Sequence, residues 1–258
     1  MTYSAFDLTG KTAIITGGNS GIGLGMAEAL ARAGANISVW GTNEAKNAAA
    51  VQKLQACGVS AMAVECDVGD EAAVEAAFAH TVAQLGHVDA CFANAGVYGS
   101  STVKSFADMP AEEWGRVMRV NLDGAFFTLR AAARHMVGRG KGGSLAVTSS
   151  LAAISGPPRG EHYAATKGGV VSLVQALAVE FGRHAIRANA ILPGWIDTPM
   201  TDKTLHWDKF AEKVLPRVPL RRWGAPEDFG GIAVYLASDA SAYHTGDTIL
   251  IDGGYSKF

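Results

Sequence analysis

Short apolar runs rich in β-branched residues alternate with longer Ala-rich segments along this chain of 258 residues. The short runs predict strands, and the longer segments, which carry apolar residues at helical spacing, predict helices. The predicted strands cover residues 11–16, 36–40, 60–66, the start of 87–96, 143–150, 186–192 and 247–252. The predicted helices cover residues 21–35, 43–58, 70–86, 110–138, 162–184 and 225–238.

This alternation predicts an α/β fold with a doubly wound, mainly parallel sheet of seven strands flanked by helices. The early strands carry few charged residues, as strands do when helices cover both faces of the sheet. No change in composition and no Ser- or Pro-rich linker divides the chain, so we expect one domain over residues 1–258. One excursion, residues 199–224, breaks the alternation, and we expect it to be a lid over a ligand site.

Composition excludes several classes of protein. The residues are 48% hydrophobic and 18% charged, and the net charge is −2, so no basic field attracts nucleic acid or anionic lipid. Cys57, Cys66 and Cys91 form no CxxC motif and are interpreted as core thiols in a reducing compartment. The first residues are too polar for a signal peptide, and no apolar stretch reaches the ~20 residues of a membrane span. We therefore expect a cytoplasmic protein without membrane or nucleic-acid partners.

A glycine-rich turn follows the first predicted strand. Its sequence, "TGGNSGIG" (16–23), places Gly17, Gly21 and Gly23 where the strand passes into a helix. Glycine lets the backbone approach a ligand closely, and the N–H groups and dipole at a helix start favour an anion. In a doubly wound sheet this turn lies at the carboxyl ends of the strands, where ligands bind. The pattern predicts the pyrophosphate site of a dinucleotide, with a mere tight turn as the alternative.

The end of the second predicted strand bears on the choice between NAD and NADP. An acid there accepts a hydrogen bond from a free 2′-hydroxyl, whereas an arginine favours a 2′-phosphate. The residues present are Trp40, Gly41, Thr42 and Asn43, so neither marker occurs. Lys46, one helical turn further, could reach a phosphate, but we interpret it as part of a solvated helix face. The choice stays open, with a slight preference for NAD because no strong cation is in place.

A Tyr–Lys pair four residues apart is the candidate for acid–base chemistry. In "YAATK" (163–167), Tyr163 and Lys167 share one face of a predicted helix. A nearby ammonium favours the phenolate, so Lys167 is expected to lower the pKa of Tyr163 from its ordinary value of about 10. Ser150 ends a predicted strand at the rim of the sheet and can donate a hydrogen bond to a substrate oxygen. Asn121 lies within a predicted helix, where a buried amide needs partners, and a water chain toward Lys167 would supply them.

Together these motifs resemble the short-chain dehydrogenase/reductase family. "TGGNSGIG", "NAG" (94–96), Asn121, Ser150, "YAATK" and "PG" (193–194) occur in the family's order, and Ser150 precedes Tyr163 by the family's usual thirteen residues. The resemblance spans nearly the whole chain, to "DGGY" near its end. It implies a Rossmann-type domain and hydride transfer between NAD or NADP and a secondary alcohol or carbonyl of a small molecule. It also implies assembly into homotetramers or homodimers and requires no metal.

The resemblance further implies roles for individual residues. Tyr163 is expected to be the general acid/base, Lys167 to lower its pKa and hold the nicotinamide ribose, and Ser150 to orient the substrate oxygen. Asn121 is expected to keep a proton-relay water. The residues expected to bind the cofactor are Gly17, Asn19, Ser20, Gly21, Ile22, Gly23, Thr42, Asn43, Asp67, Val68, Asn94, Ala95, Gly96, Tyr163, Lys167, Pro193, Gly194, Ile196 and Thr198. The chain departs from the family at Thr42, where many members carry Arg, and at Gly41, where others carry Asp.

The sequence leaves the substrate open among hydroxy or keto compounds, sugar acids and cyclic or aromatic alcohols. Its pocket is expected between Ser150, Tyr163, "VYGSST" (97–102), "GPPRGE" (156–161) and the lid. The ring side chains that favour an apolar or cyclic substrate are Tyr98, Trp195, His206 and Trp207. The arginines that can bind an anion, but are interpreted as solvated, are Arg159, Arg217, Arg221 and Arg222. His162 is interpreted as a rim residue, and the seven histidines show no cluster typical of a metal site.

Three other functions are compatible with parts of the pattern. A dinucleotide-binding regulator without catalysis would share the glycine turn but would have no need for the Ser–Tyr–Lys–Asn set. A methyltransferase with a nucleoside cofactor can also share the turn, yet it has no use for "YAATK". A structural or interaction protein would use the long predicted helices 110–138 and 162–184 as assembly surfaces, which is also compatible with an enzyme that oligomerises.

Overall fold

A parallel sheet is the framework of the computed structural model, which describes residues 3–99 and 102–257. Its strands are β1 (Thr12–Thr16), β2 (Asn36–Gly41), β3 (Ala61–Glu65), β4 (Ala90–Ala93), β5 (Gly143–Thr148), β6 (Ile186–Pro193) and β7 (Thr248–Ile251). Within the described residues these seven strands are ordered 3-2-1-4-5-6-7, and every neighbouring pair is parallel. The predicted Rossmann-type sheet is confirmed, and the strand order reverses between β1 and β4.

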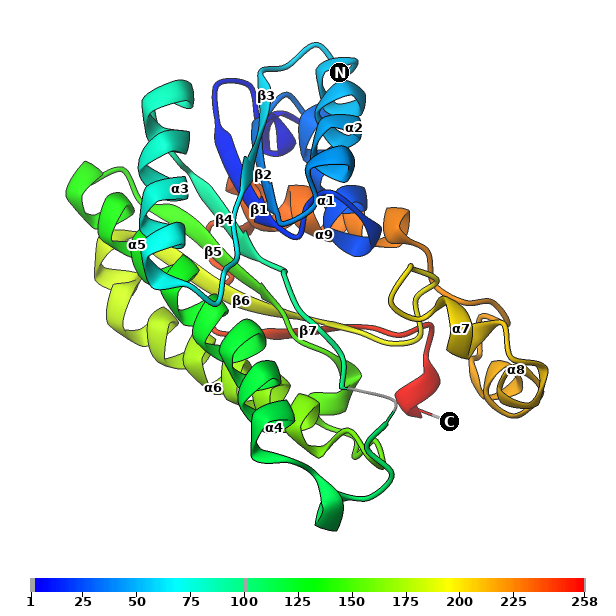
Figure 1. Cartoon of the computed structure of the whole chain (residues 1–258). Coiled ribbons are helices and arrows are strands. Elements are labelled where there is room, and N and C mark those ends of the chain that lie inside the picture. The colour runs from blue at the N-terminus through cyan, green and yellow to red at the C-terminus, as the bar shows by residue number, and fades with distance from the viewer. Residues whose placement is uncertain (1–2, 100–101, 258) are drawn as a thin grey trace.

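Helices cover both faces of this sheet (Figure 1). One face carries α1 (Gly21–Arg32), α2 (Glu44–Gln55) and α9 (Gly230–Ala237). The other carries α3 (Glu71–Leu85), α4 (Ala111–Met118), α5 (Gly124–Arg139) and α6 (Glu161–Phe181). Two short helices, α7 (Asp202–Leu205) and α8 (Asp208–Val214), lie outside these layers.

Successive residues of the central strands enter two separate hydrophobic cores. Ile14 of β1 and Trp40 of β2 pack with the core under α3, α5 and α6, whereas Ile15 and Val39 pack with the core under α1 and α9. All four side chains are fully buried. This two-sided burial explains the low charge of the early strands. The thiols of Cys66 and Cys91 are buried, Cys57 is half-buried, and all three are free.

The predicted helix 110–138 is wrong as a single element. A π-helical turn, Arg119–Asp123, separates α4 from α5 and contains Asn121. The side chain of Asn121 both donates to and accepts from the backbone of Val97. π-helical turns within α-helices often occur at functional positions. The predicted helix 225–238 likewise begins as a separate 3-10 turn, Pro226–Phe229, before α9.

The excursion 199–224 leaves the sheet after β6 and carries α7 and α8 (Figure 1). Its base is closed because the Asp197 N–H donates to the Gly224 carbonyl at 2.8 Å and the Gly224 N–H donates to the Trp195 carbonyl at 2.9 Å. The ring of Trp195 packs edge-on against Phe210 of α8, with 4.9 Å between centroids. The excursion is therefore an ordered loop held at its base and by aromatic packing.

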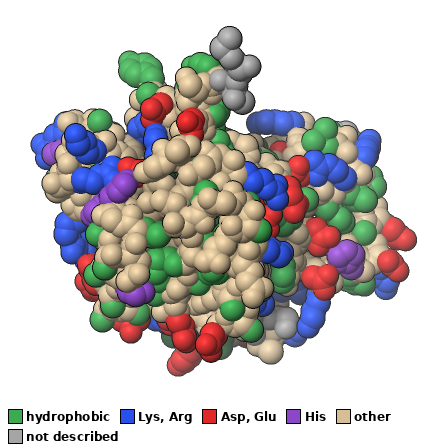
Figure 2. Space-filling view, turned by 90° about the horizontal axis from the view of Figure 1, so that it is seen from above, with side chains coloured by type: hydrophobic (Ala, Val, Ile, Leu, Met, Phe, Trp, Pro, Cys, Tyr) green, Lys and Arg blue, Asp and Glu red, His purple; other side chains and the backbone are tan. Residues whose placement is uncertain are grey.

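No helix in the described residues is long and apolar enough to cross a membrane. Acidic and basic side chains are interspersed over the face seen in Figure 2, where both signs occur on both flanks. This mixing agrees with the small net charge of −2. No single-sign field on that face would draw a polyanion toward the protein.

Close packing of α1 against the turn before α9 gives the first prediction. A Cβ atom at Gly25 would lie 2.3 Å from the Pro226 carbonyl oxygen, so Gly25→Ala should reduce the free energy of unfolding by about 1–3 kcal/mol. Gly231, in α9, is the matched control because a Cβ there meets no atom within 4 Å, and Gly231→Ala should be neutral or stabilising. Urea unfolding of both variants tests this, and equal stabilities would contradict it.

Candidate active site

A cavity of about 560 Å³ lies at the carboxyl ends of the strands, beside the reversal of strand order. Every residue that the sequence suggested for cofactor binding lines it, as do Ser150, Tyr163 and Lys167. Asn121 does not line the cavity and lies behind its wall, 2% exposed. The structure thus brings together residues that are far apart in the chain, such as Gly17 and Thr198, which are 181 positions apart.

The glycine turn has the shape that a pyrophosphate needs. Gly17 and Gly21 have φ angles of +64° and +52°, in the left-handed region that favours glycine. A Cβ at Gly23 would lie 2.4 Å from the Gly17 carbonyl oxygen and 2.5 Å from Nδ2 of Asn94. The side chain of Ser20, at the N-terminus of α1, caps none of the N–H groups of the first turn. Those groups are therefore available to an anion, and the turn fits a dinucleotide phosphate.

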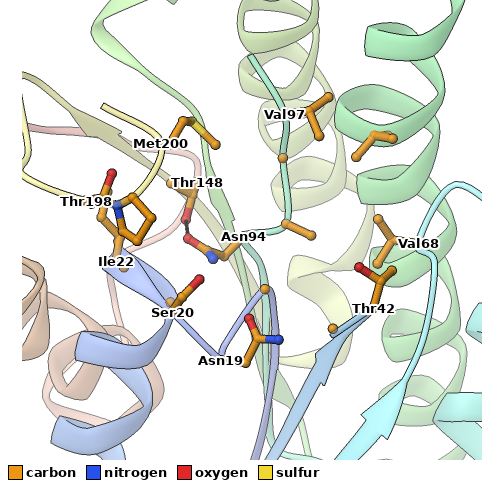
Figure 3. A pocket seen from close by; sticks show the side chains of 18 of the residues that line it. Asn19, Ser20, Ile22, Thr42, Val68, Asn94, Val97, Thr148, Thr198 and Met200 are labelled. Carbon is orange, nitrogen blue, oxygen red and sulfur yellow. Dashed lines mark hydrogen bonds between the residues drawn. The ribbon is translucent and has the colours of Figure 1, made fainter. Parts of the chain in front are cut away.

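A chain of hydrogen bonds connects the ends of β1, β4 and β5 to Lys167. Oγ1 of Thr16 accepts from the backbone N–H groups of Asn94 (3.0 Å) and Ala95 (2.9 Å). Nδ2 of Asn94 donates to the Thr16 carbonyl (3.0 Å), and Oγ1 of Thr148 donates to Oδ1 of Asn94 (2.9 Å; Figure 3). Nζ of Lys167 then donates to the Thr148 carbonyl at 2.8 Å. The sequence analysis missed Thr16 and Thr148, although each is a polar residue that ends an apolar strand.

Lys167 is a buried cation beside the ring of Tyr163. It is 4% exposed, and its Nζ lies 5.5 Å from the centroid of the Tyr163 ring. Burial lowers the pKa of Lys167 to about 8. Burial also raises the pKa of Tyr163 to about 12, although a hydrogen bond with Ser150 acts in the opposite direction. The expectation that the protein's own groups lower the pKa of Tyr163 is therefore wrong. Desolvation of the phenolate raises this pKa by more than the Ser150 hydrogen bond lowers it.

Ser150 lies within hydrogen-bonding reach of Tyr163 at the start of a 3-10 turn, Leu151–Ala153. Its Oγ accepts from the N–H of Ala152 at 3.1 Å. A hydroxyl that accepts one bond still has its own proton to donate. Ser150 can therefore donate to the phenol oxygen or to a substrate oxygen beside it.

Asn121 finds its partners in the protein. Its Oδ1 accepts from the N–H of Val97 at 2.8 Å, and its Nδ2 donates to the Val97 carbonyl at 2.9 Å and to Oγ1 of Thr166 at 3.3 Å. The amide therefore needs no water chain to satisfy it, contrary to the expectation from the sequence. It fixes the backbone that follows β4.

The end of β2 carries neutral polar groups. A Cβ at Gly41 would lie 2.3 Å from Nδ2 of Asn19, which donates to Oδ1 of Asn47 at 2.8 Å. The side chain of Asn43 accepts a hydrogen bond from the N–H of Lys46 and so caps α2. This oxygen therefore already has a partner within the protein. Lys46 is exposed, as interpreted from the sequence, and it also lines the cavity.

Asp67, one of the residues expected to bind the cofactor, is held by an arginine that sequence reasoning missed. Nη1 of Arg119 donates to its Oδ2 at 2.9 Å, and both residues line the cavity. Burial alone would raise the pKa of Asp67, but hydrogen bonds from Arg119 and from the Gly69 N–H lower it overall. Asp67 is therefore a carboxylate at neutral pH.

Tyr98, expected on the substrate side, does not line the cavity itself, but its ring centroid is 4.9 Å from that of Tyr163, which does. Residues 100–101 of the expected loop 97–102 lie outside the described residues. Trp207 is exposed on the excursion. Three of the four candidate arginines have partners inside the protein: Arg217 stacks on Tyr255, Arg221 donates to the Pro216 carbonyl, and Arg222 pairs with Asp228. Arg159 is exposed and has a φ of +64°.

Two expectations about histidines are wrong. His162 is not a rim residue: it is 0% exposed, because α6 turns it toward the segment after β4. His206 does lie in a cluster, since its ring, Asp197 and Asp202 offer ligand atoms within 4.8 Å of one another. This cluster is at the start of the excursion and two of its three residues are exposed; His206 also pairs directly with Asp202 at 3.1 Å.

Comparisons with known proteins find relatives along almost the whole chain. Residues 17–256 match a family model described as "Enoyl-(Acyl carrier protein) reductase". The chain is 40% identical over 248 residues to an L-rhamnose 1-dehydrogenase (NAD(P)(+)) of Sphingomonas sp. (strain SKA58), covering 96% of each chain. Two solved structures, each with a TM-score of 0.92, are similar. One is a short-chain type dehydrogenase/reductase from Mycobacterium marinum, with 37% identity over 98% of both chains. The other is a gluconate 5-dehydrogenase from Burkholderia cenocepacia J2315 in complex with NADP and tartrate, with 34% identity over 99% of this chain and 98% of that one.

Lys167 is buried, and among the described residues no carboxylate pairs with it. We therefore expect its charge to destabilise the folded protein. Lys167→Met should raise the free energy of unfolding at pH 7 by roughly 1–3 kcal/mol, because a buried ammonium is desolvated. The folded-state pKa of about 8 lies below the ordinary 10.5, so between these values only the unfolded chain stays protonated and wild-type stability rises with pH.

The advantage of Lys167→Met over wild type should therefore be largest below pH 8 and shrink toward pH 10.5. Thermal unfolding of both proteins across this range measures it. An advantage that is absent at pH 7, or that grows with pH, would contradict the burial of a charged amine.

Proposed function

The chain belongs to the short-chain dehydrogenase/reductase family, and on that premise we propose that Tyr163 exchanges the proton of a sugar or sugar-acid substrate. The protein is an NAD(P)-dependent oxidoreductase that transfers a hydride between the nicotinamide and a secondary alcohol or carbonyl. The observation that carries the proposal is Tyr163 beside the buried Lys167 and within hydrogen-bonding reach of Ser150 in one cavity.

Different sets of cavity residues would bind different parts of the dinucleotide. The glycine turn would hold the pyrophosphate, Asp67 and Val68 would face the adenine, and the segment 94–96 would back the ribose. The residues that would hold the nicotinamide end are Pro193, Gly194, Ile196 and Thr198. The bound dinucleotide supplies or accepts the hydride.

Tyr163 moves the proton at its phenol oxygen. With a pKa of about 12 the phenol is protonated at neutral pH, which suits donation to a carbonyl oxygen during reduction. Oxidation needs the phenolate, so positive charge must lower this pKa, and Lys167 is the cation that the chain holds beside the ring. The pKa of Lys167, about 8, keeps it charged at neutral pH.

Ser150 and Asn121 position the reacting groups. Ser150 donates to the substrate oxygen next to the phenol and so aligns the carbon for hydride transfer. Asn121 fixes the backbone after β4 through Val97, and we propose that it also keeps the proton-relay water that the family resemblance implies.

A sugar or sugar acid is the substrate class that the relatives favour. A relative 40% identical is named for L-rhamnose, and a structural neighbour is named for gluconate. The rival function, a dinucleotide-binding regulator without catalysis, would gain nothing from an ammonium buried at a cost in stability beside a phenol. We therefore favour the enzyme.

The dinucleotide choice follows from the end of β2. No carboxylate lies at Gly41 or Thr42 to repel a 2′-phosphate, and Lys46 lines the cavity near them. The relative named for L-rhamnose carries both dinucleotides in its name, and the structural neighbour holds NADP. We propose that the protein uses both NAD and NADP, in place of the slight preference for NAD that the sequence suggested.

We propose further that one catalytic domain, with residues 199–224 as its lid, acts as a homotetramer in the cytoplasm. Phe126 of α5 and Val179 of α6 are 41% and 87% exposed, and such apolar side chains on long outer helices suit contacts with a second copy. Met200, near the start of the lid, and Thr198, just before it, line the cavity.

Removal of the phenol oxygen tests the proposed acid–base role. Tyr163→Phe should lower kcat by about 10³-fold, the scale of a lost general acid–base group, and leave the dinucleotide Kd nearly unchanged. The assay is nicotinamide absorbance with the aldoses, ketoses and aldonates that wild type turns over. Tyr243→Phe is the control, since Tyr243 is fully exposed and distant in the sequence. An unchanged rate in Tyr163→Phe would favour the regulator.

Charge at position 42 tests the dinucleotide site. Thr42→Asp should raise the KM for NADP roughly tenfold by repelling the 2′-phosphate, with little effect on NAD. Thr42→Arg should lower the KM for NADP by a few-fold. Steady-state kinetics with each dinucleotide measures both. Equal shifts for NAD and NADP would mean that position 42 does not face the 2′ group.

A further inference from the structure

Tyr98 packs against Tyr163, one of the residues that line the cavity. The two rings are 4.9 Å apart between centroids and inclined at 55°. A Cβ atom at Gly160 would lie 2.9 Å from the Tyr98 hydroxyl, so this side chain reaches from the segment after β4 to the turn before α6. Tyr98 nevertheless remains 46% exposed, a high value for an aromatic residue next to the reacting phenol.

An ionic group beneath the segment holds the backbone of Tyr98. Nη2 of Arg116 donates to the Tyr98 carbonyl at 2.9 Å. The guanidinium also pairs with Glu113 through two bonds of 2.8 and 2.9 Å, and the side chain of Glu113 is only 12% exposed. Nε2 of His162 lies 3.5 Å from Oε1 of the same carboxylate. We call Arg116, Glu113 and His162 the α4–α6 bracket.

The residues on either side of Tyr98 are also fixed. A Cβ atom at Gly99 would lie 2.3 Å from two atoms of the His162 ring, so the segment rests directly on that ring. Val97 is bonded in both directions by the Asn121 amide. The ring of Tyr98 is therefore presented by a backbone held at three consecutive residues.

Burying the polar ring of His162 destabilises the fold, which is unusual for a residue with a purely structural role. Its ring is buried, and neither ring nitrogen has a hydrogen-bond partner within the described part of the chain. An apolar side chain would fill this position without an unsatisfied polar group. Unsatisfied buried polar groups that persist often serve a function, and here the ring supports the segment that carries Tyr98.

We propose that Tyr98 is the platform on which a closed-ring sugar lies against Tyr163, and that the α4–α6 bracket positions this platform. The inference rests on the proposed function and narrows its substrate class. A fixed aromatic face offers apolar contact to the C–H groups of a sugar ring at little cost in ordering. The hydroxyl to be oxidised then points at the Tyr163 and Ser150 oxygens.

An open-chain sugar acid would need a cation for its carboxylate. Arg116 is engaged by Glu113 and the Tyr98 carbonyl, and three of the four other candidate arginines are engaged inside the protein, as described above. Arg159 is the remaining candidate; it is exposed, and its charge acts on the Tyr98 hydroxyl. A neutral ring is therefore the substrate of this proposal, and an open-chain anion held by Arg159 is the outcome that would overturn it.

The test compares ring sugars, L-rhamnose and D-glucose, with an open-chain acid, D-gluconate, at saturating dinucleotide. Wild type should prefer the ring sugars. Tyr98→Ala should lower kcat/KM for them by about 20-fold or more, mainly through KM, and change gluconate turnover by less than about threefold. Tyr98→Phe, which restores the ring, should recover most of the loss.

The bracket is tested by Glu113→Gln and Arg116→Lys. Each should raise the KM for ring sugars by about five- to tenfold, with kcat and the dinucleotide Kd nearly unchanged, because the platform shifts while the phenol stays in place. The matched control is Arg134→Lys, which alters an exposed arginine–glutamate pair of α5 and α3 and should change nothing.

The outcomes that overturn the proposal can be distinguished from one another. Equal losses for ring sugars and gluconate in Tyr98→Ala, or a wild type that prefers gluconate and loses it in Arg159→Gln, overturn the platform and leave the proposed function intact. A wild type that oxidises or reduces no sugar or sugar acid overturns both. Bracket variants that lower kcat and raise the dinucleotide Kd would show a general structural role instead.

Discussion

The architecture of this site depends on one buried ammonium. Lys167 donates to the carbonyl that ends β5 and lies beside the Tyr163 ring, and burial lowers its pKa to about 8. The same burial raises the Tyr163 pKa to about 12. The cavity therefore opposes charge on both partners, and any proton exchange by the phenol must be driven by positive charge held close to it.

The strand ends hold this charge in position. Thr16, Asn94 and Thr148 connect β1, β4 and β5 by hydrogen bonds that reach from the glycine turn to Lys167. Rigid parallel strands thus align the site for the pyrophosphate with the site for the proton. On the other side, Asn121 and the α4–α6 bracket fix residues 97–99, so the substrate side is also built from ordered elements.

The sequence predicted whatever depends on local pattern. Each of three features is defined by residues close together in the sequence: the alternation of strands and helices, the glycine turn, and the Tyr–Lys spacing. The π-helical turn at Asn121, the burial of His162 and the roles of Thr16 and Thr148 depend instead on contacts between distant segments, which no local pattern encodes. The direction of the Tyr163 pKa was mistaken for the same reason, because spacing reveals the nearby lysine but not the depth of burial.

The central claim is that positive charge beside a buried phenol makes it titratable in the working range. A difference ultraviolet titration of wild type against Tyr163→Phe, with and without NAD, measures the ionisation of this one tyrosine. The account predicts a pKa of about 12 without the dinucleotide and a fall of at least about two units when it binds. A pKa that does not move on binding would contradict the account.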